Sequence, residues 1–184
     1  MENKEFIVTI KGVTPLLFNK FLESSISSEV KKRSGSIGKS KTEDKLYKNP
    51  EGKIYTPSTH ISGMLVNSAK NFKIRNKGKS TYSKLAGSCI EIEPDILIHK
   101  NQKWEEFTIS AVIPSTKGRI MISRPLIRKW EIDFNIKITD DIPEDVLKSI
   151  LDYGGQYIGI GDWRPDKKGK YGKFIVTSFK EVTK

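Results

Sequence analysis

One segment of the sequence constrains the fold more than any other, because it alternates apolar and polar side chains without interruption. Its apolar positions would share one face of an extended strand: Trp130, Ile132, Phe134, Ile136 and Ile138. The intervening positions, from Glu131 to Thr139, are polar or charged. One side of this strand must therefore pack into a core while the other faces water, as in an antiparallel sheet covered on one side.

The remaining patterns place helices and further strands around this segment. Apolar runs rich in isoleucine and valine predict strands over residues 5–13, 88–99, 106–113, 119–127 and 173–179. Apolar residues at spacings of three and four predict one helix over 58–73 and a second from Pro143 to the glycine pair Gly154–Gly155. This order predicts an α+β, ferredoxin-like (RRM-like) βαββαβ domain with an antiparallel sheet and an inserted β-hairpin.

The length of 184 residues predicts a single domain over residues 1–184. Two of its segments depart from the regular pattern. Residues at about 19–50 are rich in Ser and Lys and carry no sustained apolar period, which predicts a flexible polar loop. An inserted basic hairpin is expected at about 114–130.

The formal net charge of +11 indicates an acidic partner, because phosphates or other anions offset such self-repulsion. No stretch approaches the ~18 apolar residues that span a bilayer, and the N-terminus lacks the layout of a signal peptide. We therefore expect a cytoplasmic protein without a membrane partner. Cys89 is the only cysteine, so the chain offers no cysteine cluster for zinc, and we expect neither a metal nor a cofactor.

Basic residues gather in three runs along the chain, and this clustering favours binding to a nucleic-acid backbone. Trp163 and Tyr171 lie within the third run, and aromatic rings among cations suit single strands whose bases can stack. The alternative is that the runs are solvated loops. The candidate phosphate contacts are Lys70, Lys73, Arg75, Lys77, Lys117, Arg119, Arg124, Arg128, Arg164, Lys167, Lys168 and Lys170.

Two glycines between the second helix and the last strand, Gly159 and Gly161, permit positive φ angles and the close approach of a backbone to a phosphate. They follow a helix and precede a strand, which is the reverse of the dinucleotide-binding arrangement, and no Walker lysine accompanies them. We therefore interpret them as part of a nucleic-acid site with Trp163 and Tyr171.

Three segments together resemble a known superfamily. The stretch GGQYIGIGDWRPDKKGKYGKFIV, at 154–176, resembles the C-terminal glycine-rich loop of the RAMP superfamily, the repeat-associated proteins of CRISPR effector complexes. Residues 10–17 resemble the first strand and turn of those proteins, and residues 55–63 resemble their entry into the first helix. Within the superfamily the chain looks most like the backbone subunit that coats guide RNA, or like a standalone or phage-borne relative.

The resemblance implies non-catalytic binding of single-stranded or guide RNA, with several copies possible along one strand of an antiviral ribonucleoprotein complex. A second branch of the superfamily consists of metal-independent endoribonucleases that process guide RNA, in which His60 would be the general base. The equal alternative is that His60, which lies near the start of a predicted helix, is a surface or capping residue. Binding to single-stranded DNA, or to an acidic protein partner, is the third alternative.

Overall fold

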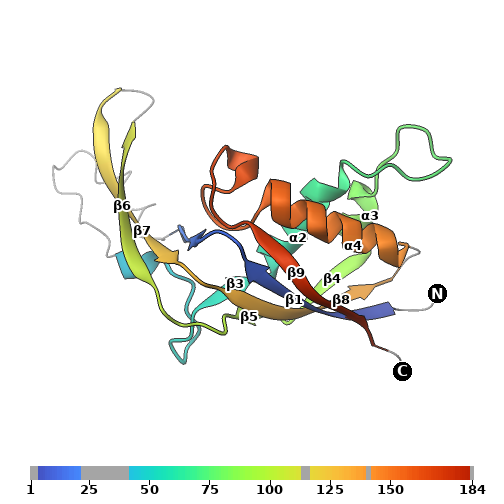
Figure 1. Cartoon of the computed structure of the whole chain (residues 1–184), viewed down its shortest axis with the longest axis horizontal. Helices are drawn as coiled ribbons and strands as arrows, with labels where there is room; N and C mark the ends of the chain where they lie inside the picture. The colour runs from blue at the N-terminus through green and yellow to red at the C-terminus, as the bar shows by residue number, and fades with distance from the viewer. Residues whose placement is uncertain (1–3, 22–41, 113–116, 140–141, 183–184) are drawn as a thin grey trace.

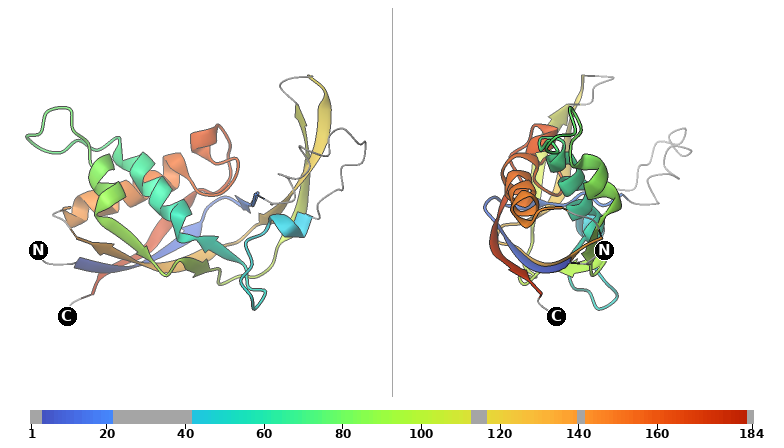
Figure 2. Two further views of the ribbon diagram at one scale, coloured as in Figure 1. Left: turned by 180° about the vertical axis from the view of Figure 1, so that it is seen from behind. Right: turned by 90° about the vertical axis from the view of Figure 1, so that its right-hand side faces the viewer.

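The computed structural model describes residues 4–21, 42–112, 117–139 and 142–182. Its main sheet has the strand order β4-β8-β1-β9, with every neighbouring pair antiparallel. The strands are β1 (Lys4–Gly12), β4 (Ile90–Glu93), β8 (Glu131–Ile138) and β9 (Phe174–Glu181). Two helices, α2 (Ser58–Ala69) and α4 (Glu144–Tyr153), lie on one face of the sheet (Figures 1 and 2). This is the ferredoxin-like arrangement that the sequence predicts.

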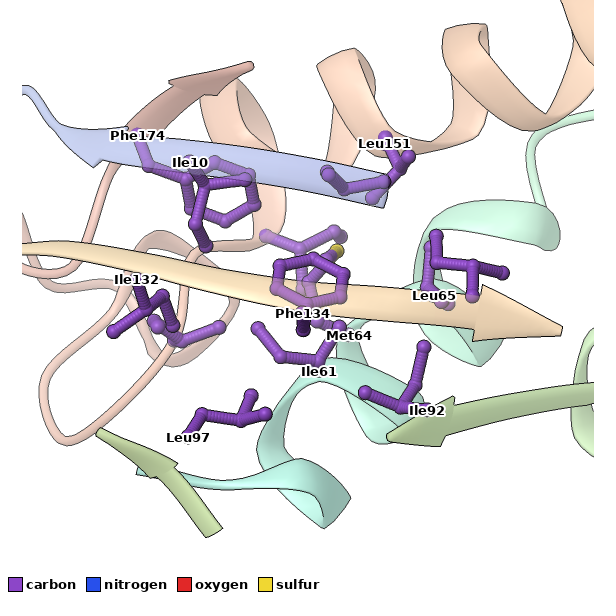
Figure 3. Packing of buried hydrophobic residues seen from close by; sticks show 14 of the residues in the cluster. Ile10, Ile61, Met64, Leu65, Ile92, Leu97, Ile132, Phe134, Leu151 and Phe174 are labelled. Atoms are coloured by element: carbon purple, nitrogen blue, oxygen red, sulfur yellow. The ribbon is translucent and has the colours of Figure 1, made fainter. Parts of the chain in front are cut away.

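The core lies between the sheet and the two helices. The apolar face predicted for the segment 130–139 is confirmed, because each of its five apolar side chains is at most 2% exposed. Phe6, Val8 and Ile10 of β1 extend this surface, and Ile61, Met64 and Leu65 of α2 pack against it (Figure 3). The apolar side chains that recur every two residues in the strands therefore pack against those that recur every three or four residues in the helices, and together they form one apolar layer.

A second, smaller sheet projects from one end of the domain (Figure 1). It contains the hairpin of β6 (Glu105–Val112) and β7 (Arg119–Ile127), with β2 (Leu16–Leu17) paired to the base of β7. A third pairing joins β3 (Tyr55–Pro57) to β5 (Ile96–Ile98) below the start of α2. The hairpin overlaps the basic insertion expected at about 114–130, but it begins earlier, at Glu105, and ends at Ile127. Residues 113–116 are outside the described residues.

Several local predictions differ from the structure. The first helix ends at Ala69 rather than near residue 73, because the amides of Asn71 and Phe72 turn back to Ser68 and Ala69. The basic connector that follows it contains a short helix, α3 (Ser83–Ser88). The glycine pair does not end the second helix, which continues as the π-helical turn η2 (Gly154–Ile158).

The flexible loop predicted at 19–50 is only partly within the described residues, since 22–41 are not. Its last part differs from the prediction. Residues 42–45 form the 3₁₀ turn η1 (Thr42–Lys45), and Leu46 is buried in the core. The ammonium of Lys45 donates to the carbonyl oxygen of Ser123 in β7 at 2.7 Å. This part of the segment therefore packs against the hairpin.

Gly155 lies where η2 crosses β9, and a Cβ atom placed there would overlap the carbonyl oxygen of Phe174. We expect Gly155→Ala to destabilise the protein by about 1–3 kcal/mol, because the obstructing atom belongs to the backbone of a paired strand and cannot rotate away. Equilibrium urea unfolding measures the change.

Gly87→Ala is the matched control. Gly87 lies in α3, and the nearest atom to its added Cβ would be 3.6 Å away on Val66, which is ordinary contact. We expect this variant to be neutral or more stable by up to about 1 kcal/mol, because alanine favours the helix. Equal effects of the two variants would contradict this account of the crossing.

Candidate nucleic-acid interface

A cleft of about 160 Å³ lies between the first turns of α2 and the glycine loop that follows η2. It is lined by Thr59, His60, Gly63, Met64, Asn67, Gly159, Ile160, Gly161 and Arg164. Four of these are residues that the sequence singles out: His60, Gly159, Gly161 and Arg164. The fold thus brings the helix entry and the glycine loop to one place, although they are far apart in the sequence.

The glycine loop is held by backbone contacts to the segment around β2. The amide of Asp162 donates to the carbonyl oxygen of Leu17 at 2.9 Å, and the amide of Gly172 donates to that of Pro15 at 2.8 Å. Gly161 has a φ of +78°, and a Cβ there would lie 2.6 Å from the Leu17 carbonyl oxygen. The close contact that requires glycine at position 161 is therefore with the backbone of Leu17, whereas the sequence predicted a contact with a phosphate.

Arg124 has a different role from the phosphate contact expected of it. Only 8% of the residue is exposed, and its Nε forms an ion pair with Asp162 of the glycine loop. Its guanidinium also lies 4.6 Å from the centroid of the Trp163 ring. Arg124 therefore fastens the hairpin to the loop through an ion pair and a cation–π contact.

The two aromatic residues predicted for base stacking contact each other. The rings of Trp163 and Tyr171 are nearly parallel with centroids 6.5 Å apart, and Tyr171 meets Phe107 of β6 edge-on. Both are half-buried rather than fully exposed. These two rings therefore add to the contact that Arg124 makes between the hairpin and the glycine loop.

His60 lies in the wall of the cleft, with its ring edge-on to Tyr47 at 5.5 Å. Burial, with a smaller contribution from the positive charge of Arg164, lowers the pKa of His60 below its usual value. The imidazole is therefore neutral near pH 7. Its Nδ1 is buried and has no hydrogen-bond partner among the described residues.

Among the described residues that line the cleft, Arg164 is the one Lys or Arg side chain. One guanidinium nitrogen donates to the carbonyl oxygen of Gly161 at 3.1 Å, and another donates to Asp166 at 3.2 Å. These contacts orient the side chain along the loop and leave it partly exposed. Its charge faces the same cleft as His60.

The other predicted basic residues lie in three places on the helix-bearing side of the sheet. The connector after α2 projects at one end, the hairpin at the other, and the loop around η3 (Pro165–Lys167) lies between them (Figures 1 and 2). Arg128 is exposed at the base of the hairpin, where it pairs with Glu105. The remaining cations are exposed: Lys70, Lys73, Arg75, Lys77, Lys117, Arg119, Lys167, Lys168 and Lys170.

Sequence reasoning missed the polar stripe of α2 that forms one wall of the cleft. Thr59, Gly63 and Asn67 are four residues apart, and this spacing aligns them on one face of the helix opposite the apolar stripe. The amide oxygen of Asn67 accepts a hydrogen bond from Lys70 at 2.8 Å. The regular spacing of small and polar residues was the available signal.

The described residues contain no group of three His, Cys, Asp or Glu side chains arranged to hold a metal ion. Among the same residues, no helix is long and apolar enough to cross a membrane.

Comparisons with known proteins bear on the fold. No protein-family model matches the chain, and no curated protein matches it in sequence. One of the many solved structures that share the fold matches nearly the whole chain. It is a chain of the Type III-B Cmr-beta assembly, solved by cryo-EM bound to cognate target RNA, with a TM-score of 0.63 and 16% identity. The match covers 99% of the present chain and 61% of the Cmr-beta chain, so the present chain spans less than two thirds of it.

The pairing of Arg124 with Asp162 predicts a stability effect. We expect Asp162→Asn to lower the free energy of unfolding by about 2 kcal/mol, because it leaves the buried guanidinium without a charged partner. Chemical denaturation followed by tryptophan fluorescence measures the loss.

Arg128→Ala is the comparison variant, since it removes an exposed hairpin cation whose side chain is 68% exposed. Its effect should stay within about 0.5 kcal/mol, as for other exposed ion pairs. An Asp162→Asn protein as stable as this control would show that Arg124 does not depend on its ion pair.

Proposed function

We propose that this chain binds single-stranded RNA without cleaving it, and that the strand runs along the polar face of α2 and over the glycine loop. The observation that carries the proposal is the cleft in which His60, Arg164 and the glycines meet, with basic segments extending beyond it on both sides. A phosphate backbone requires this combination of an open, polar groove and flanking cations.

The charge of the opposite face supports this choice of surface. The residues that point away from the helices include Glu91 and Glu93 of β4 and Glu131 and Asp133 of β8, opposed by Lys11 and Lys137. In RNA-recognition motifs the exposed sheet face stacks bases on aromatic rings. Here that face carries these carboxylates on β4 and β8, so the helix-bearing side suits a polyanion better.

The fold match supports RNA as the ligand class in preference to DNA. The solved counterpart is a chain of an assembly bound to target RNA, and the RAMP-like segments of the sequence point to the same kind of complex. By that likeness we propose that several copies, or other subunits, assemble along one strand in a CRISPR-type ribonucleoprotein. Binding to an acidic protein is the alternative that the first experiment tests.

The experiment measures binding of the purified protein to labelled single-stranded RNA, single-stranded DNA and duplex RNA over a salt series. We expect the tightest binding to single-stranded RNA, with affinity falling steeply as salt rises, because each phosphate contact releases counterions. Arg164→Ala should weaken binding and reduce the slope of log affinity against log salt by about one contact.

Lys180→Ala is the matched control, because Lys180 is an exposed cation of β9 that pairs with Ile7 on the opposite face. It should leave both the affinity and the salt slope unchanged. Weak binding to all three nucleic acids would refute the proposal and indicate that the charge serves a protein partner.

One observation favours cleavage as a second candidate function. His60, whose imidazole is neutral, lines the same cleft as Arg164. A neutral histidine can accept the proton of a ribose 2′-hydroxyl while a nearby cation stabilises the phosphate. If this candidate is right, the wild-type protein cleaves RNA without added metal, and His60→Ala loses cleavage while it keeps binding. An RNA substrate that stays intact with the wild-type protein would end this candidate.

A further inference from the structure

Three aromatic rings form a ladder beside the cleft, on the outer surface of the helix layer. The rings of Tyr153 and Tyr157 lie 4.7 Å apart between centroids, and Phe72 meets Tyr153 edge-on at 5.8 Å. Tyr153 and Phe72 are partly buried against the core. Tyr157 is 53% exposed, so the ladder ends in a ring that faces outwards.

The π-helical turn sets the position of this exposed ring. The Met64 side chain lies against Gly154, and the Phe174 carbonyl lies so close to Gly155 that this position has no room for a side chain. The turn therefore sits directly on α2 and β9. Tyr157 follows the glycines within the turn and packs against Tyr153 one turn earlier, with the two ring planes inclined at 40°. π-Helical turns often occur at functional sites.

The surroundings of the ladder are basic. Phe72 lies between Lys70 and Lys73, which are both exposed, and Arg75 and Lys77 follow in the same connector. Within the described residues, none of these four cations pairs with a carboxylate. Asp152 lies next to Tyr153 in the sequence, but its carboxylate pairs with Lys148 at 2.9 Å. The ladder thus connects the exposed ring of Tyr157 to a segment of unpaired positive charges around Phe72, and rings and cations together bind unpaired bases.

We infer that Tyr157 is a stacking site for one base of the bound single strand, placed between the cleft and the basic connector. This inference rests on the proposed function and adds a base-contacting position to it. Continuity supports it: Asn67 lines the cleft and contacts Lys70, and Lys70 leads directly to Phe72 at the foot of the ladder. The ladder therefore adjoins the end of the cleft at which the cations of the connector begin.

The test places 2-aminopurine at each position in turn of a short single-stranded RNA and measures its quenching on binding. With the wild-type protein we expect one position to be strongly quenched, because stacking on a tyrosine ring quenches this base. Tyr157→Ala should remove that quenching and weaken binding roughly tenfold, in line with base–aromatic stacking elsewhere. An abasic substitution at the same position should weaken the wild-type protein by a similar factor and leave the variant unaffected.

Three controls separate stacking from damage to the fold. Tyr157→Phe keeps the flat ring and should keep both quenching and affinity. Tyr157→Leu keeps an apolar contact to Tyr153 but lacks the ring, so it should bind as weakly as Tyr157→Ala. Ile175→Ala truncates an equally exposed apolar residue on the opposite face of the sheet and should change nothing.

The outcomes distinguish this inference from the proposed function. Unchanged quenching and affinity in both Tyr157→Ala and Tyr157→Leu, with binding still weakened by Arg164→Ala, would overturn the stacking site and leave RNA binding in place. A wild-type protein that binds no single-stranded RNA would overturn both.

Discussion

The crossing of the glycine loop over β2 holds the candidate interface together. Gly161 approaches the carbonyl oxygen of Leu17 more closely than any side chain would allow, and the next amide donates to the same oxygen. Because β2 also pairs with the base of β7, the loop is tied to the hairpin as well as to the sheet. Arg124 of the hairpin provides a further link, because its side chain forms an ion pair with Asp162 of the loop.

This crossing determines which groups can face a ligand. It turns Asp162 inward to the hairpin and leaves Arg164 on the cleft side, although the two residues are close in sequence. The loop therefore uses the partly buried carboxylate of Asp162 to neutralise a structural arginine, and presents the cation of Arg164 to the cleft. A loop that turned an arginine towards the hairpin and presented a carboxylate to the cleft would repel a phosphate strand.

The protein distributes its excess charge unevenly. Ion pairs concentrate on the outer face of the sheet and at the base of the hairpin, as in Lys137 with Glu93 and Arg128 with Glu105. The connector after α2 and the loop around η3 project into solvent on the other side, where water and salt screen repulsion between like charges (Figure 1). A net charge of +11 is compatible with a stable fold because the cations are placed on projecting segments.

The sequence predicted the sheet and its two helices because those elements have a regular apolar period that a core must bury. The alternation in 130–139 sufficed to identify β8 and its buried face. The burial of Arg124 could not be predicted in the same way, since its partners Asp162 and Trp163 reach it only through the tertiary fold. The π-helical turn was missed because a glycine pair after a helix usually signals its end, whereas here close packing requires the glycines.

Under the proposed function, Gly63 shows how RNA binding and stability are opposed within α2. A glycine inside a helix costs about 1 kcal/mol relative to alanine, and such a cost usually has a packing reason. Here no described atom beyond the adjoining residues and the helix's own backbone lies within 4 Å of the position that a Cβ would occupy, so packing does not require glycine. The residue lines the cleft between Thr59 and Asn67. Its missing side chain keeps the helix surface open to a backbone approaching from outside, which is the access that a phosphate strand needs.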